Sequence, residues 1–275
     1  MAEPDHHRID IIVSSDDVDL VVDQIWLTDP LAVGEAETPD GRTHYTVGYA
    51  DGEAARQAID RLAPWDPTLG AVRHDSWVDT WRAEAKPQVA GPFRIRLPEH
   101  EPTPDGIDLV IEPGATFGFG HPSTLLALEL LANIDVHGAE IADIGSGSGV
   151  LAIAAALSGA TTVHAVDIAA DAVAATVDNA SRNGVDVRAA AGSVDALPPG
   201  PFDLVLANVT AGTQAEILPA LGSRLGSATT IILSGLLDGQ QADAAALVPD
   251  HEIVDTRRLD GWVAVRLAVS RIASP

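Results

Sequence analysis

The sequence predicts an α/β protein in which a small α+β domain precedes a larger, mostly parallel sheet with helices on both faces. The first 75 residues read as strands and helices in the order β-α-β-β-α-β. From about residue 121, strands alternate with Ala-rich helices, and a glycine-rich turn follows the first of these strands. Strands joined through helices pair in parallel, because the helix carries the chain back to the end of the sheet at which the previous strand began.

The N-terminal elements follow from hydrophobic spacing and turn residues. The expected order is a strand at 8–13, a helix with Val18, Val21, Val22 and Ile25 on one face, strands at 32–38 and 43–49, a helix at 52–62 and a strand at 71–74. Pro39-Asp40-Gly41 predicts the hairpin between the two middle strands. This order is the ferredoxin-like plan.

The next segment is expected to connect two domains. Trp77 and Trp81 lie one helical turn apart, and a proline-rich stretch follows them from Pro87 to Pro104. The alternating segments 93–97 and 107–111 predict a small hairpin. We therefore expect a ferredoxin-like domain at 1–75, a linker helix and hairpin at 76–112, and a second domain at 113–275.

The second domain should contain five parallel strands and a final antiparallel pair. The expected strands are 140–144, 162–166, 186–191, 202–207 and 229–234, and Asp260-Gly261 predicts a hairpin between 252–259 and 262–268. The sheet would then have seven strands.

A glycine-rich turn indicates a nucleoside-cofactor site in this domain. The run from Ile141 to Val150 contains Asp143, Gly145 and Gly147, and Asp167 ends the next strand, 18 residues past Gly149. The dinucleotide fingerprint needs a third glycine at position 150, which is Val150. An acidic residue before G-x-G-x-G instead favours S-adenosylmethionine (AdoMet), and the final hairpin fits a seven-stranded Rossmann-like methyltransferase sheet.

Two further segments belong to the predicted site. Residues 112–124 form a glycine-punctuated loop that leads into a helix and can lie over a ligand bound at the strand ends. Asn208 ends a buried strand beside the switch point, where its side-chain carbonyl can accept a hydrogen bond from a substrate amine. A helix N-cap or a turn is the alternative role for this residue.

Nearly the whole chain resembles the bacterial ribosomal protein L11 methyltransferases, or PrmA-like proteins. The matching motifs are Pro113 to Thr124, Asp143 to Ala154, Asn179 to Gly184, Leu206 to Val209, Ser234 to Leu237, and the Trp77 and Trp81 pair. The chain departs from the family at Phe119, where the family has Thr and one more residue before the His.

The resemblance implies that an N-terminal ferredoxin-like domain recognises ribosomal protein L11 and that the second domain methylates its lysine side chains and N-terminal amine. It places AdoMet contacts on Thr124, Gly145, Asp167 and Asn208, with Asp143 and Gly147 in the glycine motif, Phe117 over the cofactor, and Ser193 and Val194 near the adenine. Asn208 is the expected catalytic residue, and no metal is needed.

Composition limits the other classes of function. The chain has 275 residues and no cysteine, which excludes a disulfide framework, a thiolate zinc site and a cysteine nucleophile. It has one lysine and a net charge of −24, so we expect no direct binding of nucleic acid. We also expect no membrane binding. Residues 144–166 carry no formal charge, but glycines and polar residues interrupt them. The N-terminus lacks the features of a secretory signal, and a cytoplasmic monomer is expected.

Three alternatives stay open on the sequence alone. The chain could be an AdoMet-dependent N-methyltransferase for another protein or a small molecule. It could be a non-catalytic AdoMet-binding module, although the glycine turn and Asp167 are intact. A nicotinamide oxidoreductase is the third alternative, and Val150 argues against it.

Overall fold

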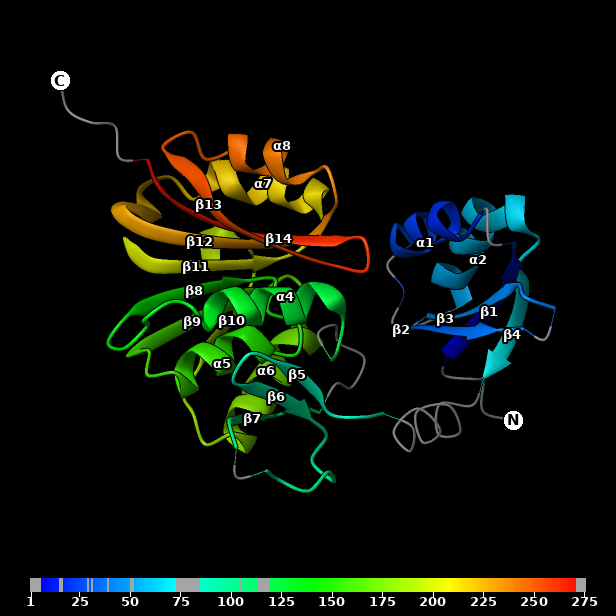
Figure 1. Cartoon of the computed structure of the whole chain (residues 1–275), viewed down its shortest axis with the longest axis horizontal. Coiled ribbons are helices and arrows are strands. Elements are labelled where there is room, and N and C mark those ends of the chain that lie inside the picture. Colours follow the sequence, from blue (N-terminus) through cyan, green and yellow to red (C-terminus); the bar gives the residue numbers. More distant parts are fainter. Residues whose placement is uncertain are drawn as a thin grey trace. The chain divides into compact units, whose positions relative to one another are not determined.

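The structure is a computed structural model that describes residues 6–14, 17–28, 30, 32–38, 40–49, 52–72, 85–103, 105–112 and 119–270. The chain divides into two compact units, Met1–Ala85 and Lys86–Pro275 (Figure 1). The linker tryptophans Trp77 and Trp81 lie outside the described residues.

The first unit is a four-stranded antiparallel sheet with two helices. Its elements are β1 (His6–Val13), α1 (Val18–Trp26), β2 (Ala32–Glu37), β3 (Thr43–Tyr49), α2 (Gly52–Leu62), the short 3-10 turn η1 (Ala63–Trp65) and β4 (Thr68–Val72). The strand order is β2-β3-β1-β4. The helices cover one face, because alternate residues such as Ile9, Ile11, Tyr45 and Val47 are buried with them in one core.

The last strand of this unit begins earlier than the predicted 71–74. Leu69 in β4 pairs with Ile9 in β1, so the pairing starts directly after the turn at Asp66, whose φ is +51°. The predicted hairpin between β2 and β3 is confirmed by their antiparallel register.

The second unit begins with a small three-stranded sheet. It contains β5 (Gln88–Ala90), β6 (Phe93–Arg96) and β7 (Ile107–Val110). The predicted hairpin between 93–97 and 107–111 is wrong, because β6 and β7 are parallel and the antiparallel partner of β6 is β5. The chain after β6 returns to the start of that strand, where the Ile107 N–H donates to the Pro92 carbonyl at 2.7 Å.

The main sheet of this unit has seven strands among the described residues. They are β8 (Glu140–Ile144), β9 (Thr162–Asp167), β10 (Arg188–Ala191), β11 (Phe202–Asn208), β12 (Leu225–Leu237), β13 (His251–Leu259) and β14 (Trp262–Val269). The order is β10-β9-β8-β11-β12-β14-β13, parallel through β12 and antiparallel after it. The predicted alternation of strands with helices and the C-terminal hairpin are confirmed. Strand β12 is longer than the predicted 229–234.

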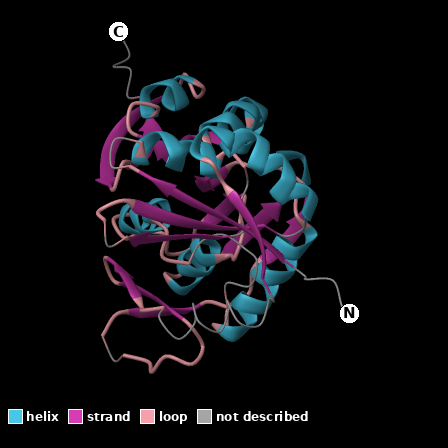
Figure 2. Cartoon of the chain, turned by 90° about the vertical axis from the view of Figure 1, so that its right-hand side faces the viewer, coloured by secondary structure: helices cyan, strands magenta, loops and turns pink. Residues whose placement is uncertain are grey.

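Helices cover both faces of this sheet (Figures 1 and 2). The helices are α4 (Pro122–Leu131), α5 (Val150–Leu157), α6 (Ala170–Arg182), α7 (Ala211–Ala220) and α8 (Gln241–Ala246), with 3-10 turns η2 (Val194–Ala196) and η3 (Gly222–Arg224). Alternate strand residues divide between two cores. Ile141 and Leu206 pack with α4 and α5, whereas Ala142 and Ala207 pack with α7 and α8.

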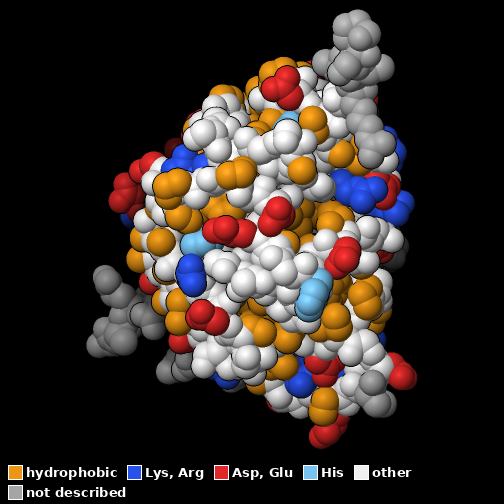
Figure 3. Space-filling view, turned by 90° about the vertical axis from the view of Figure 1, so that its left-hand side faces the viewer, with side chains coloured by type: hydrophobic (Ala, Val, Ile, Leu, Met, Phe, Trp, Pro, Cys, Tyr) orange, Lys and Arg blue, Asp and Glu red, His pale blue; other side chains and the backbone are white. Residues whose placement is uncertain are grey.

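Charged side chains are spread over the surface that Figure 3 shows. On this face, Lys and Arg side chains lie in separate small groups, with acidic and apolar side chains between them. Within the described residues, no helix has the length and the apolar character that a membrane span requires.

Candidate functional site

The predicted site lies where the strand order reverses. From β8 the chain continues through β9 and β10 on one side, then crosses to β11 on the other side of β8. The carboxyl ends of β8 and β11 are neighbours, since Ile144 pairs with Ala207. Ligands of open α/β sheets bind in the crevice at such a switch point. The turn at Gly145 and the side chain of Asn208 therefore flank the expected crevice.

The glycine turn after β8 has a backbone that only glycine adopts readily. Gly145, Gly147 and Gly149 have φ angles of +76°, +54° and +81°. A Cβ atom on Gly145 would collide with Cγ1 of Val209, the residue after Asn208. The Gly145 N–H donates to the Val166 carbonyl at 2.8 Å, which holds the turn against β9. The turn thus brings bare backbone close to the ends of β9 and β11.

Asp167 lies beside this turn, as predicted. Its Oδ2 accepts a hydrogen bond from the Gly147 N–H at 2.9 Å, and its Oδ1 accepts one from the Ala169 N–H at 3.0 Å. An ionised carboxylate offers about four acceptor positions. Two backbone bonds leave Asp167 able to accept two more donors, as a ribose with two neighbouring hydroxyls requires.

Asp143 lies beneath the turn and is almost completely buried, with 1% of its surface exposed. Its Oδ2 accepts from the Ala152 N–H at 3.1 Å in the first turn of α5, and its Oδ1 has no hydrogen-bond partner among the described residues. Burial raises the pKa of this carboxyl to about 7, and the negative charge of Asp167 adds to the rise. In this structure Asp143 supports the turn from within.

Asn208 and Thr124 are brought together from positions 84 residues apart. The Asn208 Nδ2 donates to the Thr124 hydroxyl at 3.1 Å, and Thr124 is fully buried in the first turn of α4. The other end of the amide, Oδ1, is buried and has no hydrogen-bond partner within the described part of the chain. One bond therefore fixes the amide, and its carbonyl oxygen stays able to accept a hydrogen bond.

Ser193 and Val194 follow β10, next to the strand that ends in Asp167. The Gly192 N–H donates to the Asp167 carbonyl at 2.9 Å, which brings this loop to the end of β9. Ser193 is partly exposed, whereas the Val194 side chain is 3% exposed and packs in the core. Contacts from Val194 to a ligand would therefore come mainly from its backbone.

Phe117 lies in the segment 113–118, outside the described residues. The chain is described again from Phe119, which packs against the core beside α4. His121 caps α4, since its Nδ1 accepts from the Ser123 N–H at 3.2 Å, and its ring meets Trp262 edge-on at 4.6 Å. Burial lowers the pKa of His121 to about 4, so the ring is neutral at physiological pH.

Sequence reasoning gave no role to the individual residues of the Asn179 to Gly184 motif. The Asn179 amide bonds both the N–H and the carbonyl of Glu112, at 2.9 and 3.0 Å, and the carbonyl of Ser148 in the glycine turn at 2.9 Å. One helical turn later, the Asn183 amide bonds the N–H and the carbonyl of Val110, both at 2.8 Å. The sequence did contain a signal for this role, because two asparagines four residues apart lie on the same face of a helix.

Ile168 is a second residue to which sequence reasoning gave no role. This residue directly follows Asp167 and is 84% exposed, the highest exposure among the large apolar side chains described. An apolar side chain at the end of β9, beside a carboxylate suited to a ribose, offers a flat base a surface to pack against. The position after the strand-ending Asp is a signal that the sequence already contained.

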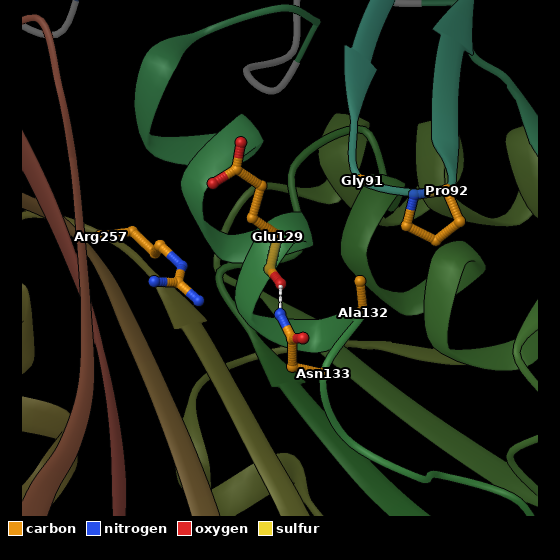
Figure 4. A pocket seen from close by; sticks show the side chains of 6 residues that line it. All are labelled: Gly91, Pro92, Glu129, Ala132, Asn133 and Arg257. Carbon is orange, nitrogen blue, oxygen red and sulfur yellow. Dashed lines mark hydrogen bonds between the residues drawn. The ribbon is translucent and has the colours of Figure 1, made fainter.

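A hollow of about 530 Å³ lies elsewhere on this unit (Figure 4). Its lining residues are Gly91, Pro92, Glu129, Ala132, Asn133 and Arg257. The Asn133 Nδ2 donates to the Glu129 carbonyl at 2.7 Å. Glu129 and Asn133 lie toward the end of α4 opposite to Thr124, so the hollow contains none of the predicted site residues.

Comparisons with known proteins show which family the chain resembles. The family profile described as ribosomal protein L11 methyltransferase (PrmA) matches residues 51–269. The ribosomal protein L11 methyltransferase of Methylococcus capsulatus is 40% identical over 211 residues, which cover 74% of this chain and 71% of that protein. The protein of the same name from Azotobacter vinelandii is 34% identical over 254 residues, 90% of this chain and 84% of its own.

A solved structure also resembles the chain. The ribosomal protein L11 methylase of Lactobacillus delbrueckii subsp. bulgaricus superposes with a TM-score of 0.61 at 29% identity, over 66% of this chain and 97% of that one. The matched profile spans most of the chain, including the glycine turn, Asp167 and Asn208. The chain therefore belongs to the ribosomal protein L11 methyltransferase family.

Proposed function

We propose that this chain transfers methyl groups from AdoMet to amino groups of ribosomal protein L11, namely lysine side chains and the N-terminal amine. The observation that carries the proposal is the Asn208 amide at the switch point. Its Nδ2 is bound to Thr124, and its buried Oδ1 has no partner among the residues that the structure describes. An unpaired acceptor in this position suits the N–H of a methyl-accepting amine.

The residues at the switch point fit AdoMet. Asp167 keeps acceptor capacity for the ribose hydroxyls, and Ile168 offers apolar surface to the adenine. The turn at Gly145 has no side chain, so backbone groups can approach the methionine part of the molecule. Ser193 and Val194 at the next strand end would lie near the adenine, and Phe117 would cover the cofactor.

The reaction needs little covalent chemistry from the protein. When bound, AdoMet supplies a methyl group already activated on a sulfonium. A lysine ammonium has an unperturbed pKa near ~10.4 and cannot attack until it loses a proton. Asn208 would hold the neutral amine by accepting a hydrogen bond from its N–H and would align the nitrogen lone pair with the methyl group. Proximity and alignment then provide most of the rate.

We infer further that the second unit has the seven-stranded Rossmann-like methyltransferase fold and that the first is a ferredoxin-like domain that recognises the protein substrate. The order β2-β3-β1-β4, with two helices on one face, supports the second assignment. Residues 1–75 hold 16 Asp and Glu side chains against 5 Arg. This acidic excess suits a basic partner such as a ribosomal protein.

We also propose that the protein acts in the cytoplasm as a monomer and does not bind nucleic acid directly. A net charge of −24 opposes binding to phosphates, and the 16 basic residues form no run along the sequence. A ribosomal protein substrate supports this location, because bacterial ribosomal proteins are made and assembled in the cytoplasm.

Replacing Asp167 by alanine should weaken AdoMet binding by about 1.5–3 kcal/mol, the range for hydrogen bonds to a charged group. The variant loses the acceptors for the ribose hydroxyls and the bond that Asp167 makes to the Gly147 N–H. Isothermal titration calorimetry with AdoMet measures the change. The exposed Asp171 in the first turn of α6 is the matched control, because Asp171→Ala removes an equal charge nearby.

Two results would count against the cofactor assignment. One is equal AdoMet affinity for Asp167→Ala and the wild type. The other is tight binding of NAD by the wild type together with no detectable binding of AdoMet.

A further inference from the structure

Gln214 connects the ends of two neighbouring strands beside Asn208. This residue lies in α7 and is fully buried. Its Nε2 donates to the Val209 carbonyl at 2.9 Å and to the Ser234 carbonyl at 2.8 Å. Val209 follows Asn208, and Ser234 in β12 pairs with Asn208 across the sheet. One side-chain amide thus holds the peptide after Asn208 and the strand next to it.

Ser234 makes a second connection, to the helix that carries Thr124. Its hydroxyl donates to the Ser123 carbonyl at 2.7 Å, and the next residue, Thr124, accepts from the Asn208 amide at 3.1 Å. The two strand ends also approach closely, since a Cβ on Gly235 would lie 2.6 Å from the Val209 carbonyl oxygen.

These bonds close a ring around Asn208. The ring runs from the Asn208 amide to Thr124, along the chain to Ser123, across to Ser234, on to Gln214 and back through Val209. The side chains of Ser123, Thr124, Gln214 and Ser234 are all 0% exposed. A buried donor or acceptor that loses its partner costs the full desolvation of that group, so the ring has one favoured geometry.

We infer that Gln214 and Ser234 are positioning residues that fix the backbone and the amide plane of Asn208 for methyl transfer. The inference rests on the proposed role of Asn208 with the amine. Neither side chain needs to touch AdoMet or the amine, because each acts through Val209, Ser123 or Thr124. Displacing a catalytic group by about 1 Å can cost a hundredfold in rate, so a loosened ring should affect turnover more than binding.

The test compares Gln214→Met, Gln214→Glu and Ser234→Ala in the full chain. We expect kcat to fall on the order of tenfold to a hundredfold in Gln214→Met, with less than about a threefold change in the dissociation constant for AdoMet. Ser234→Ala should also lower kcat with little change in the dissociation constant for AdoMet. Its loss of kcat should be smaller, because it removes one bond of the ring and keeps the two bonds that Gln214 donates. Circular dichroism and thermal unfolding report whether each variant folds.

Gln214→Glu adds a pH signature. An ionised carboxylate cannot donate to two carbonyls, but a protonated one can donate to one of them, and burial favours the protonated form. The kcat of Gln214→Glu relative to that of the wild type should therefore fall as the pH rises.

Thr210→Ala is the matched control on the same helix. The Thr210 hydroxyl caps α7 by accepting from the Thr213 N–H at 3.4 Å and has no bond to Val209 or Ser234. It should keep the wild-type kcat. Equal losses of kcat in Thr210→Ala and Gln214→Met at matched stability would overturn the inference, as would an unchanged kcat in Gln214→Met. A normal kcat in Asn208→Ala would instead refute the proposed role of Asn208 itself.

Discussion

Asn208→Ala should lower the turnover number on the order of a hundredfold and leave the affinity for AdoMet within about threefold of the wild type. A hundredfold loss corresponds to about 2.7 kcal/mol of transition-state stabilisation. The reason is the unpaired Oδ1, which we assign to the amine, whereas the Nδ2 is already bound to Thr124. Single-turnover kinetics with saturating AdoMet measure the chemical step directly.

Asn133→Ala provides the control for this substitution. Asn133 is exposed and follows α4. Among the described residues, its side chain bonds only the Glu129 carbonyl. It should keep the wild-type rate. Unchanged single-turnover rates in Asn208→Ala would show that the amide does not act on the amine. A loss confined to AdoMet affinity would make Asn208 a cofactor ligand only.

Asp143→Asn should change how the stability of the fold depends on pH. Burial raises the pKa of this carboxyl from 3.8 in the unfolded chain to about 7 in the folded one. A carboxyl with a raised folded pKa favours the fold below pH 3.8 and loses that contribution as the pH rises to about 7. The asparagine does not titrate, so it avoids this loss, on the order of 4 kcal/mol in total.

Urea unfolding from pH 4 to 8 measures this effect. The free energy of unfolding of Asp143→Asn minus that of the wild type should rise by about 1.4 kcal/mol per pH unit up to about pH 7 and then level off. Ser148→Ala changes a buried group of the same turn that does not titrate, so its difference from the wild type should not vary with pH. A constant difference for Asp143→Asn would show that its pKa is not raised.

Local patterns were sufficient to predict most of the elements. Short, mostly apolar runs predicted the strands that carry Asp143, Asp167 and Asn208, because these strands are buried between helices on both faces of the sheet. The final hairpin followed from Asp260-Gly261, where Asp260 indeed has a positive φ of +49°. The same reasoning failed at β6 and β7, since alternation is identical in parallel and antiparallel pairs and the loop between them decides the direction.

The sequence predicted which residues come together at the switch point, but it did not predict the hydrogen bonds between them. The glycine motif included Asp143 in the predicted site, yet the sequence could not show that its side chain lies beneath the turn against Ala152. Asn179 reaches Glu112 across 67 residues of sequence, and Ser234 reaches Ser123 across 111. Bonds over such separations depend on the assembled sheet, and no local spacing reveals them.

The central claim is that the chain moves a methyl group from AdoMet to amino groups of ribosomal protein L11. The most direct test incubates the full chain with AdoMet labelled in its methyl group and with purified L11, followed by mass spectrometry of L11. We predict label on lysine side chains and on the N-terminal amine, and at least a tenfold slower gain of label with Asn208→Ala. Unlabelled L11, in a reaction where the same enzyme labels another protein or a small molecule, would contradict the account.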